Sequence, residues 1–70
     1  MNKINFARSQ SAHKRLAKRN GELYYKTGKV AYGISRLYHK QVVENQSFIG
    51  RVLTKDEKKA VFRNSKGWFN

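Results

Sequence analysis

The 70-residue sequence contains no cysteine and no proline, and only four of its residues are acidic. Without cysteine the chain has no disulfide, and with only two histidines it lacks the ligands of a structural zinc site. No apolar run approaches the roughly 20 residues of a membrane span, and the N-terminus lacks the apolar segment of a secretory signal. These absences fit a cytoplasmic protein, and no metal or cofactor is expected.

Positive charge is abundant: 16 lysines and arginines against four acids give a formal net charge of +12. A domain this basic repels itself unless an anionic partner offsets part of the charge. Nucleic acid, either DNA or RNA, is the commonest such partner, ahead of acidic proteins and acidic membrane surfaces. With no repeat and no linker, residues 1–70 are expected to form one small domain, with residues 1–4 and 67–70 frayed.

Glycines and tyrosines concentrate between Gly21 and Gly33 and predict a β-hairpin with Thr27-Gly28 at its turn. Glycine accepts the positive φ that a two-residue turn requires. Alternation would place Leu23, Tyr25, Val30 and Tyr32 on one face of the hairpin and Tyr24, Lys26, Lys29 and Ala31 on the other. Of the first face, Leu23, Tyr25 and Tyr32 are expected to join the core. The predicted fold class is therefore α+β, with helices packed on the hairpin. An all-α domain of three helices is the alternative.

A first helix is predicted from about Phe6 to Arg19, capped by Asn5 or Ser9 and ended by Asn20-Gly21. Residues placed at about 100° intervals separate into two opposite arcs. The inner arc contains Phe6, Ser9, Ala12, His13, Leu16 and Ala17, and the outer arc contains Arg8, Lys14, Arg15, Lys18 and Arg19. Like charges four residues apart repel each other, so the outer arc favours an anionic partner over simple solvation.

A middle helix is predicted to run to about Asn45, with Ser35 as its N-cap. Its buried stripe would contain Ile34, Leu37, Tyr38 and Val42, and its solvent side Arg36, His39 and Lys40. Residues 46–53 form either a buried strand or a short helix, because periodicity does not distinguish the two in a short apolar run.

The segment from Thr54 to Glu57 matches a capping box, in which the side chains of the N-cap threonine and the N3 glutamate bond each other's backbone amides. A last helix is therefore predicted from Lys55 to about Asn64. Leu53, Ala60, Val61 and, beyond the helix, Trp68 would join the core. Phe62 instead falls in a basic arc with Lys55, Lys58, Lys59 and Arg63.

Catalytic motifs are few. The Asp56-Glu57 pair is explained by helix capping, His13 by a position at the edge of the core, and His39 by solvent exposure. Thr27-Gly28-Lys29 matches only the end of a phosphate-binding loop. The protein is therefore not expected to be an enzyme or to take a small-molecule substrate.

Basic residues interleaved with aromatic ones predict a non-catalytic nucleic-acid-binding protein, because cations neutralise phosphates and aromatic rings stack on unpaired bases. Three surfaces qualify: the outer arc of the first helix, the hairpin face with Tyr24, Lys26 and Lys29, and the basic arc around Phe62. The composition is typical of a small phage or bacterial accessory or regulatory factor.

Two alternatives remain open at the level of sequence. The first is an interaction module or inhibitor that docks on an acidic protein through Tyr24, Phe62, Trp68 and Phe69. The second is a basic peptide that acts at membrane surfaces through the first helix. The target nucleic acid, DNA or RNA and double- or single-stranded, also stays open, as does sequence specificity.

Overall fold

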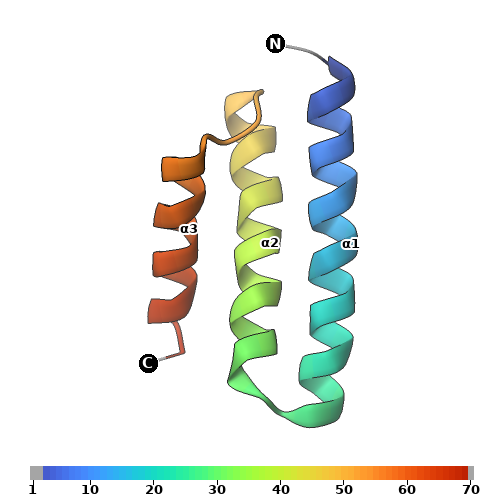
Figure 1. The fold of residues 1–70 in the computed structure, drawn as a ribbon, viewed down its shortest axis with the longest axis vertical. Coiled ribbons are helices and arrows are strands. Elements are labelled where there is room, and N and C mark those ends of the chain that lie inside the picture. Colours follow the sequence, from blue (N-terminus) through green and yellow to red (C-terminus); the bar gives the residue numbers. More distant parts are fainter. Residues whose placement is uncertain (1–2, 70) are drawn as a thin grey trace.

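The computed structural model describes residues 3–69, and over that range it consists of three α-helices without a strand: α1 (Lys3–Thr27), α2 (Val30–Ile49) and α3 (Lys55–Gly67). Figure 1 shows them side by side, with α2 in the middle and each neighbour antiparallel to it. Within residues 3–69, α1 and α3 each pack on α2, and the two outer helices make no helix–helix contact with each other. The fold is thus an open array and not a closed bundle.

The open arrangement leaves a large surface. The chain exposes 5348 Å², whereas a compact protein of 8.2 kDa would expose about 4500 Å². The array measures 38 × 21 × 16 Å, so it is long and thin. None of the helices within residues 3–69 combines the length and the hydrophobicity needed to cross a bilayer.

The predicted β-hairpin is wrong, and with it the α+β fold class; the all-α alternative is correct. Residues 21–27 continue α1 as a helix. Gly28 then ends α1 with a φ of 69°, and its amide donates to the carbonyl oxygen of Tyr24 at 2.8 Å. Glycine at Thr27-Gly28 therefore does mark a chain reversal, but the reversal joins two helices and not two strands.

Gly21 does not stop α1, and the side chain of Arg36 from α2 lies against it. A Cβ atom at Gly21 would lie 3.0 Å from the side chain of Arg36. Beyond this point the helical period decides which tyrosine turns inward: Tyr24 is half-buried, whereas Tyr25, predicted for the core, is 91% exposed. The predicted caps Asn5 and Ser9 lie inside the helix, which already includes Lys3 and the supposedly frayed Ile4; residues 1, 2 and 70 lie outside the described part.

Helix α2 is longer at both ends than predicted. It begins directly after Lys29, and the predicted cap Ser35 lies inside it. Residues 46–49 complete α2 and residues 50–54 connect it to α3, so the segment 46–53 is neither a strand nor a separate helix. The predicted inner stripe is confirmed, with Val42 fully buried and Ile34, Leu37 and Tyr38 half-buried.

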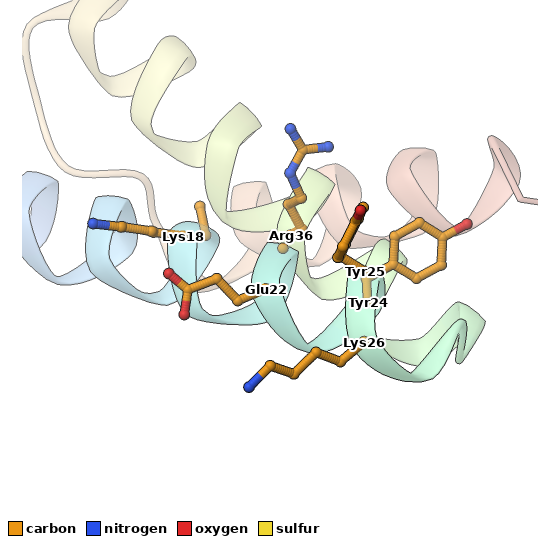
Figure 2. A pocket seen from close by; sticks show the side chains of 8 residues that line it. Lys18, Glu22, Tyr24, Tyr25, Lys26 and Arg36 are labelled. Atoms are coloured by element: carbon orange, nitrogen blue, oxygen red, sulfur yellow. The ribbon is translucent and has the colours of Figure 1, made fainter.

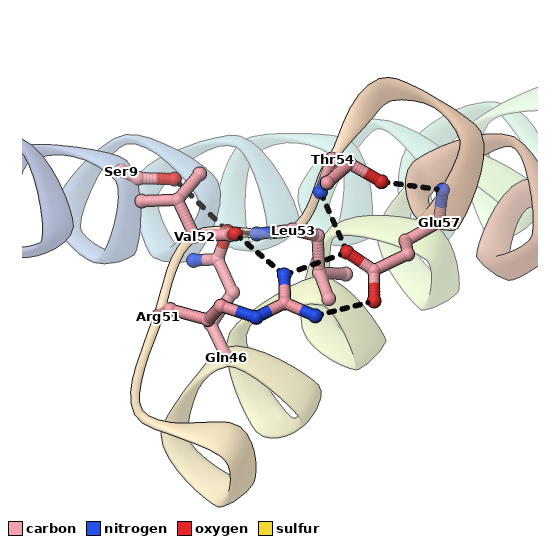
Figure 3. A network of polar contacts seen from close by, with 7 residues as sticks. All are labelled: Ser9, Gln46, Arg51, Val52, Leu53, Thr54 and Glu57. Carbon is pink, nitrogen blue, oxygen red and sulfur yellow. Dashed lines mark hydrogen bonds and ion pairs between the residues drawn. The ribbon is translucent and has the colours of Figure 1, made fainter. Parts of the chain in front are cut away.

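Helix α3 begins as predicted, at a complete capping box. The Glu57 amide donates to the Thr54 hydroxyl at 3.2 Å, and the Thr54 amide donates to the Glu57 carboxylate at 2.8 Å. Arg51 donates two hydrogen bonds to the same carboxylate, at 2.7 and 2.9 Å (Figure 3). The Arg51 bonds, followed by the Thr54 amide, lower the pKa of Glu57 to about 2. The helix continues to Gly67, beyond the predicted end at Asn64.

The apolar core is small: within residues 3–69 its buried members are Val42, Leu53 and Val61, and Tyr38 packs against them. Ala60 and Trp68, both predicted for the core, are exposed, Trp68 by 76%. Phe69, which follows α3, packs edge-to-face on Tyr24 of α1, with ring centroids 6.0 Å apart. No residue of α1 is buried.

Side-chain hydrogen bonds connect α1 to α2. The fully buried Gln46 accepts from the Leu53 amide at 3.1 Å and from the Ser9 hydroxyl at 3.2 Å (Figure 3). Its amide nitrogen donates to Gln10 at 2.8 Å, and Gln10 in turn donates to Ser47 at 2.7 Å. α1 is therefore held by a polar network that joins it to α2 and to the segment before α3.

Candidate nucleic-acid interface

The cations predicted for the outer arc of the first helix lie together on α1, on the side turned away from α2. Arg8, Lys14, Arg15, Lys18 and Arg19 are all exposed. Because α1 continues to Thr27, Lys26 joins the same side two turns after Arg19. We call these six residues the α1 cationic face. Glu22 is the only acid in α1.

The predicted hairpin face does not exist as a surface. Tyr24 turns toward α2 and contacts Phe69, Lys26 belongs to the α1 cationic face, and Lys29 lies at the start of α2. The three residues were grouped because a strand alternates every second residue, and in a helix this spacing turns them in different directions.

A shallow hollow instead connects the α1 cationic face to α2. It has a volume of about 670 Å³ and is lined by Ala17, Lys18, Gly21, Glu22, Tyr24, Tyr25, Lys26 and Arg36. Figure 2 shows Lys18, Glu22 and Lys26 on α1, with Arg36 contributed by α2. The exposed ring of Tyr25 lies at its edge. Arg36 is not among the site residues predicted from the sequence, because its place beside Gly21 depends on how α1 and α2 pack.

The basic arc of the last helix is brought together around a groove. Its volume is about 650 Å³, and the residues that line it are Tyr38, Lys55, Lys58, Lys59, Phe62, Arg63 and Lys66. We call it the α3 groove. Phe62 is 46% exposed, and its ring meets that of Tyr38 edge-to-face, with centroids 5.6 Å apart and planes at 77°. Among residues 3–69, no carboxylate lines this groove.

Two groove residues were missed by the sequence analysis. Lys66 lies one turn after Phe62 and falls within reach of it because α3 extends to Gly67. Tyr38 was assigned to the core, where it does pack, but one part of its ring also forms the wall of the groove. The four-residue spacing of Phe62 and Lys66 is enough to predict that they lie on the same side of a helix. The contribution of Tyr38 depends instead on how α2 and α3 pack.

The two histidines lie next to this groove and bond to each other. The Nδ1 atoms of His13 and His39 are 2.7 Å apart, so one ring donates a hydrogen bond through its N–H and the other accepts it. His39, predicted to face solvent, is therefore half-buried, whereas the core-edge position of His13 is confirmed. The Tyr38 ring lies in a T-shaped arrangement with both imidazoles.

Both imidazoles are neutral at neutral pH. Burial, then the charge of Lys58, then His39 lower the pKa of His13 from 6.5 to about 4. Burial and Lys58 also lower the pKa of His39, and burial raises that of Tyr38. The pair thus adds no positive charge to the groove. Within residues 3–69, no group of three or more potential ligands could hold a metal ion.

Comparisons with protein-family models, with curated proteins and with solved structures find no match for this chain.

Proposed function

We propose that the protein binds nucleic acid and does not act on it chemically. The observation that carries this proposal is the distribution of charge. The cations of the α1 cationic face and of the α3 groove take part in no ion pair, and the one ion pair within residues 3–69 joins Arg51 to Glu57. An anionic polymer would relieve the repulsion among these cations.

The α1 cationic face suits a polymer better than a single anion. From Arg8 to Lys26 it extends over about 27 Å, at 1.5 Å per residue. A phosphate backbone supplies closely spaced negative charges over such a length. Contacts to phosphates position a protein on nucleic acid and carry no direct sequence information, so sequence preference would be modest. A cytoplasmic location, where nucleic acid is accessible, belongs to the same proposal.

A salt series with labelled duplex DNA, single-stranded DNA and RNA tests the proposal. Log affinity should fall linearly with log salt, with a slope of about −0.9 per phosphate contact on duplex DNA. The double variant Arg15→Glu/Arg19→Glu should bind more weakly and reduce the slope by about 2, while its circular dichroism stays that of the parent.

The matched control is Lys29→Glu/Lys40→Glu, which changes the net charge by the same amount through two exposed lysines outside both surfaces. Its affinity should stay near that of the parent. Equal losses in the two variants would show that only net charge matters and would contradict the α1 cationic face. Absence of binding to all three nucleic acids at low salt would overturn the proposed function.

Exposed aromatic side chains outside the groove favour a second candidate, a module that docks on an acidic protein. Tyr25 and Phe48 are each 91% exposed and Trp68 is 76% exposed, and aromatic residues dominate the energetics of protein interfaces. Under this candidate, nuclease-treated protein would retain a protein partner in a pull-down, and Trp68→Ala would release it. Co-purified nucleic acid would favour the first candidate. It would be visible as a raised ratio of the absorbance at the nucleic-acid maximum to the absorbance at the protein maximum.

A further inference from the structure

We propose that the α3 groove is a stacking site for an unpaired base, and that the ligand of the protein is therefore single-stranded nucleic acid. Phe62 would receive the face of the base, and the surrounding cations would hold the phosphates on either side of it. This inference rests on the proposed function and specifies its ligand.

The ring of Phe62 is exposed and yet fixed in place. About half of the residue faces solvent, while its edge-to-face contact with Tyr38 sets the plane of the ring. Tyr38 in turn packs against the core formed by Val42, Leu53 and Val61. A ring that is already oriented loses little conformational freedom when a ligand arrives. Every base has a flat π face, so such a ring accepts any of them.

Cations lie on both sides of this ring along α3. Lys58 and Lys59 lie one turn before Phe62, Lys66 lies one turn after it, and Lys55 and Arg63 complete the set. From Lys55 to Lys66 the cations cover about 16 Å of helix. The acids at the start of α3 do not compensate them, because Asp56 and Glu57 do not line the groove and Glu57 is bonded to Arg51.

The size and chemistry of the groove fit a nucleotide. Its volume of about 650 Å³ lies within the range of roughly 300–1,000 Å³ that is typical of small-molecule sites. In a duplex the bases are stacked inside the helix, so their flat faces are not available to Phe62, and only phosphates, sugars and base edges could be contacted. An acidic polypeptide would satisfy the lysines but would leave the exposed Phe62 without a flat partner. A single strand offers phosphates to the lysines and the flat face of a base to Phe62.

The test compares Phe62→Leu with the parent protein on three ligands: a single-stranded oligonucleotide, an abasic strand of the same length, and a duplex. Leucine keeps an apolar contact with Tyr38 and removes the flat face. The variant should lose about 5- to 150-fold in affinity for the base-containing single strand, which corresponds to one base–aromatic stack. Its affinity for the abasic strand and the duplex should stay unchanged. Phe48→Leu is the matched control, since Phe48 is exposed but lies outside the groove, and it should change nothing.

A second variant supplies a direct readout. Trp68 is the only tryptophan, so Phe62→Trp combined with Trp68→Phe places the sole indole in the groove. The base-containing strand should quench its fluorescence, and the abasic strand should not.

Equal affinity of parent and Phe62→Leu for the single strand, together with salt-dependent binding of all three ligands, would overturn the stacking site and leave the proposed function intact. Competition by poly-glutamate as strong as that by the oligonucleotide would also overturn it, and would assign the groove to an acidic polypeptide. If the parent binds none of the ligands at low salt, the proposed function itself fails.

Discussion

Replacing Gln46 by leucine should destabilise the protein by about 1–3 kcal/mol, although leucine is the more hydrophobic residue and Gln46 is fully buried. The glutamine oxygen accepts a hydrogen bond from the amide of Leu53, itself a buried residue. Leucine offers no acceptor, so this amide would stay buried without a partner. Leaving a buried donor unpaired costs about 1–3 kcal/mol. Ser9 and Gln10 also lose a bond, but they are only half-buried and can bond water instead.

The size of this effect is large for a protein with so small a core. At about 0.05–0.15 kcal/mol per residue, a chain of this length has a free energy of unfolding of about 3.5–10 kcal/mol. A domain of 60–100 residues loses about 4–8 °C in Tm per kcal/mol. A cost near the middle of the range, about 2 kcal/mol, would therefore lower the Tm of Gln46→Leu by about 8–16 °C.

Thermal and urea unfolding followed by far-ultraviolet circular dichroism would measure the loss, with an unchanged urea m-value as evidence that the extent of unfolding is the same. The control is Asn45→Leu on the same helix, because Asn45 is exposed and its side-chain amide donates to the carbonyl of Gln41 one turn earlier. It should change stability by no more than about 0.5 kcal/mol. A Tm of Gln46→Leu at or above that of the parent would refute the claim that this network holds the array together.

Three further perturbations have expected outcomes. Thr54→Ala should cost about 0.5–2 kcal/mol in urea unfolding through loss of the cap on α3, and a loss equally large in Thr54→Ser would contradict that cause. Lowering the pH from about 6.5 to about 4 should lower the Tm, because unfolded His13 binds a proton at its ordinary pKa of 6.5 and the folded form only at about 4. His13→Gln should flatten this dependence, and an unchanged slope would exclude His13 as its source. Raising the ionic strength with an inert salt from about 0.01 to 0.1 M shortens the Debye length from about 30 to 10 Å and should raise the Tm, since the excess cations repel one another; a constant or falling Tm would show that the repulsion is negligible.

The parts of the fold that the sequence predicts correctly are those with local causes. The capping box at Thr54 specifies where α3 begins, and the inner stripe of α2 follows from its own period. Residues 20–27, the last third of α1, are not predicted as helix because tyrosines and glycines favour strands and turns locally. The neighbour of Gly21 is Arg36, on another helix, and no local pattern shows such a contact.

The candidate site divides in the same way. Phe62 and its neighbouring lysines lie on one helix, so their clustering follows from helical geometry alone. Arg36 lines the hollow beside α1 and Tyr38 lines the α3 groove. Both side chains come from α2, so their places depend on how the helices pack. The pairing of His13 with His39 likewise joins positions 26 residues apart, and both residues had only single-helix explanations in the sequence.

Among the helices α1 packs only on α2, it touches the segment after α3 through Tyr24 and Phe69, and it buries none of its residues. It is therefore the helix that can open locally while α2 and α3 keep the apolar core closed. A strand long enough to bind the α1 cationic face and the α3 groove together would link two helices that do not touch each other. Its binding free energy would then add to the free energy that keeps α1 docked. Under the proposed function, the nucleic acid would bridge α1 and α3 and so supply the contact between them that the fold itself lacks within residues 3–69.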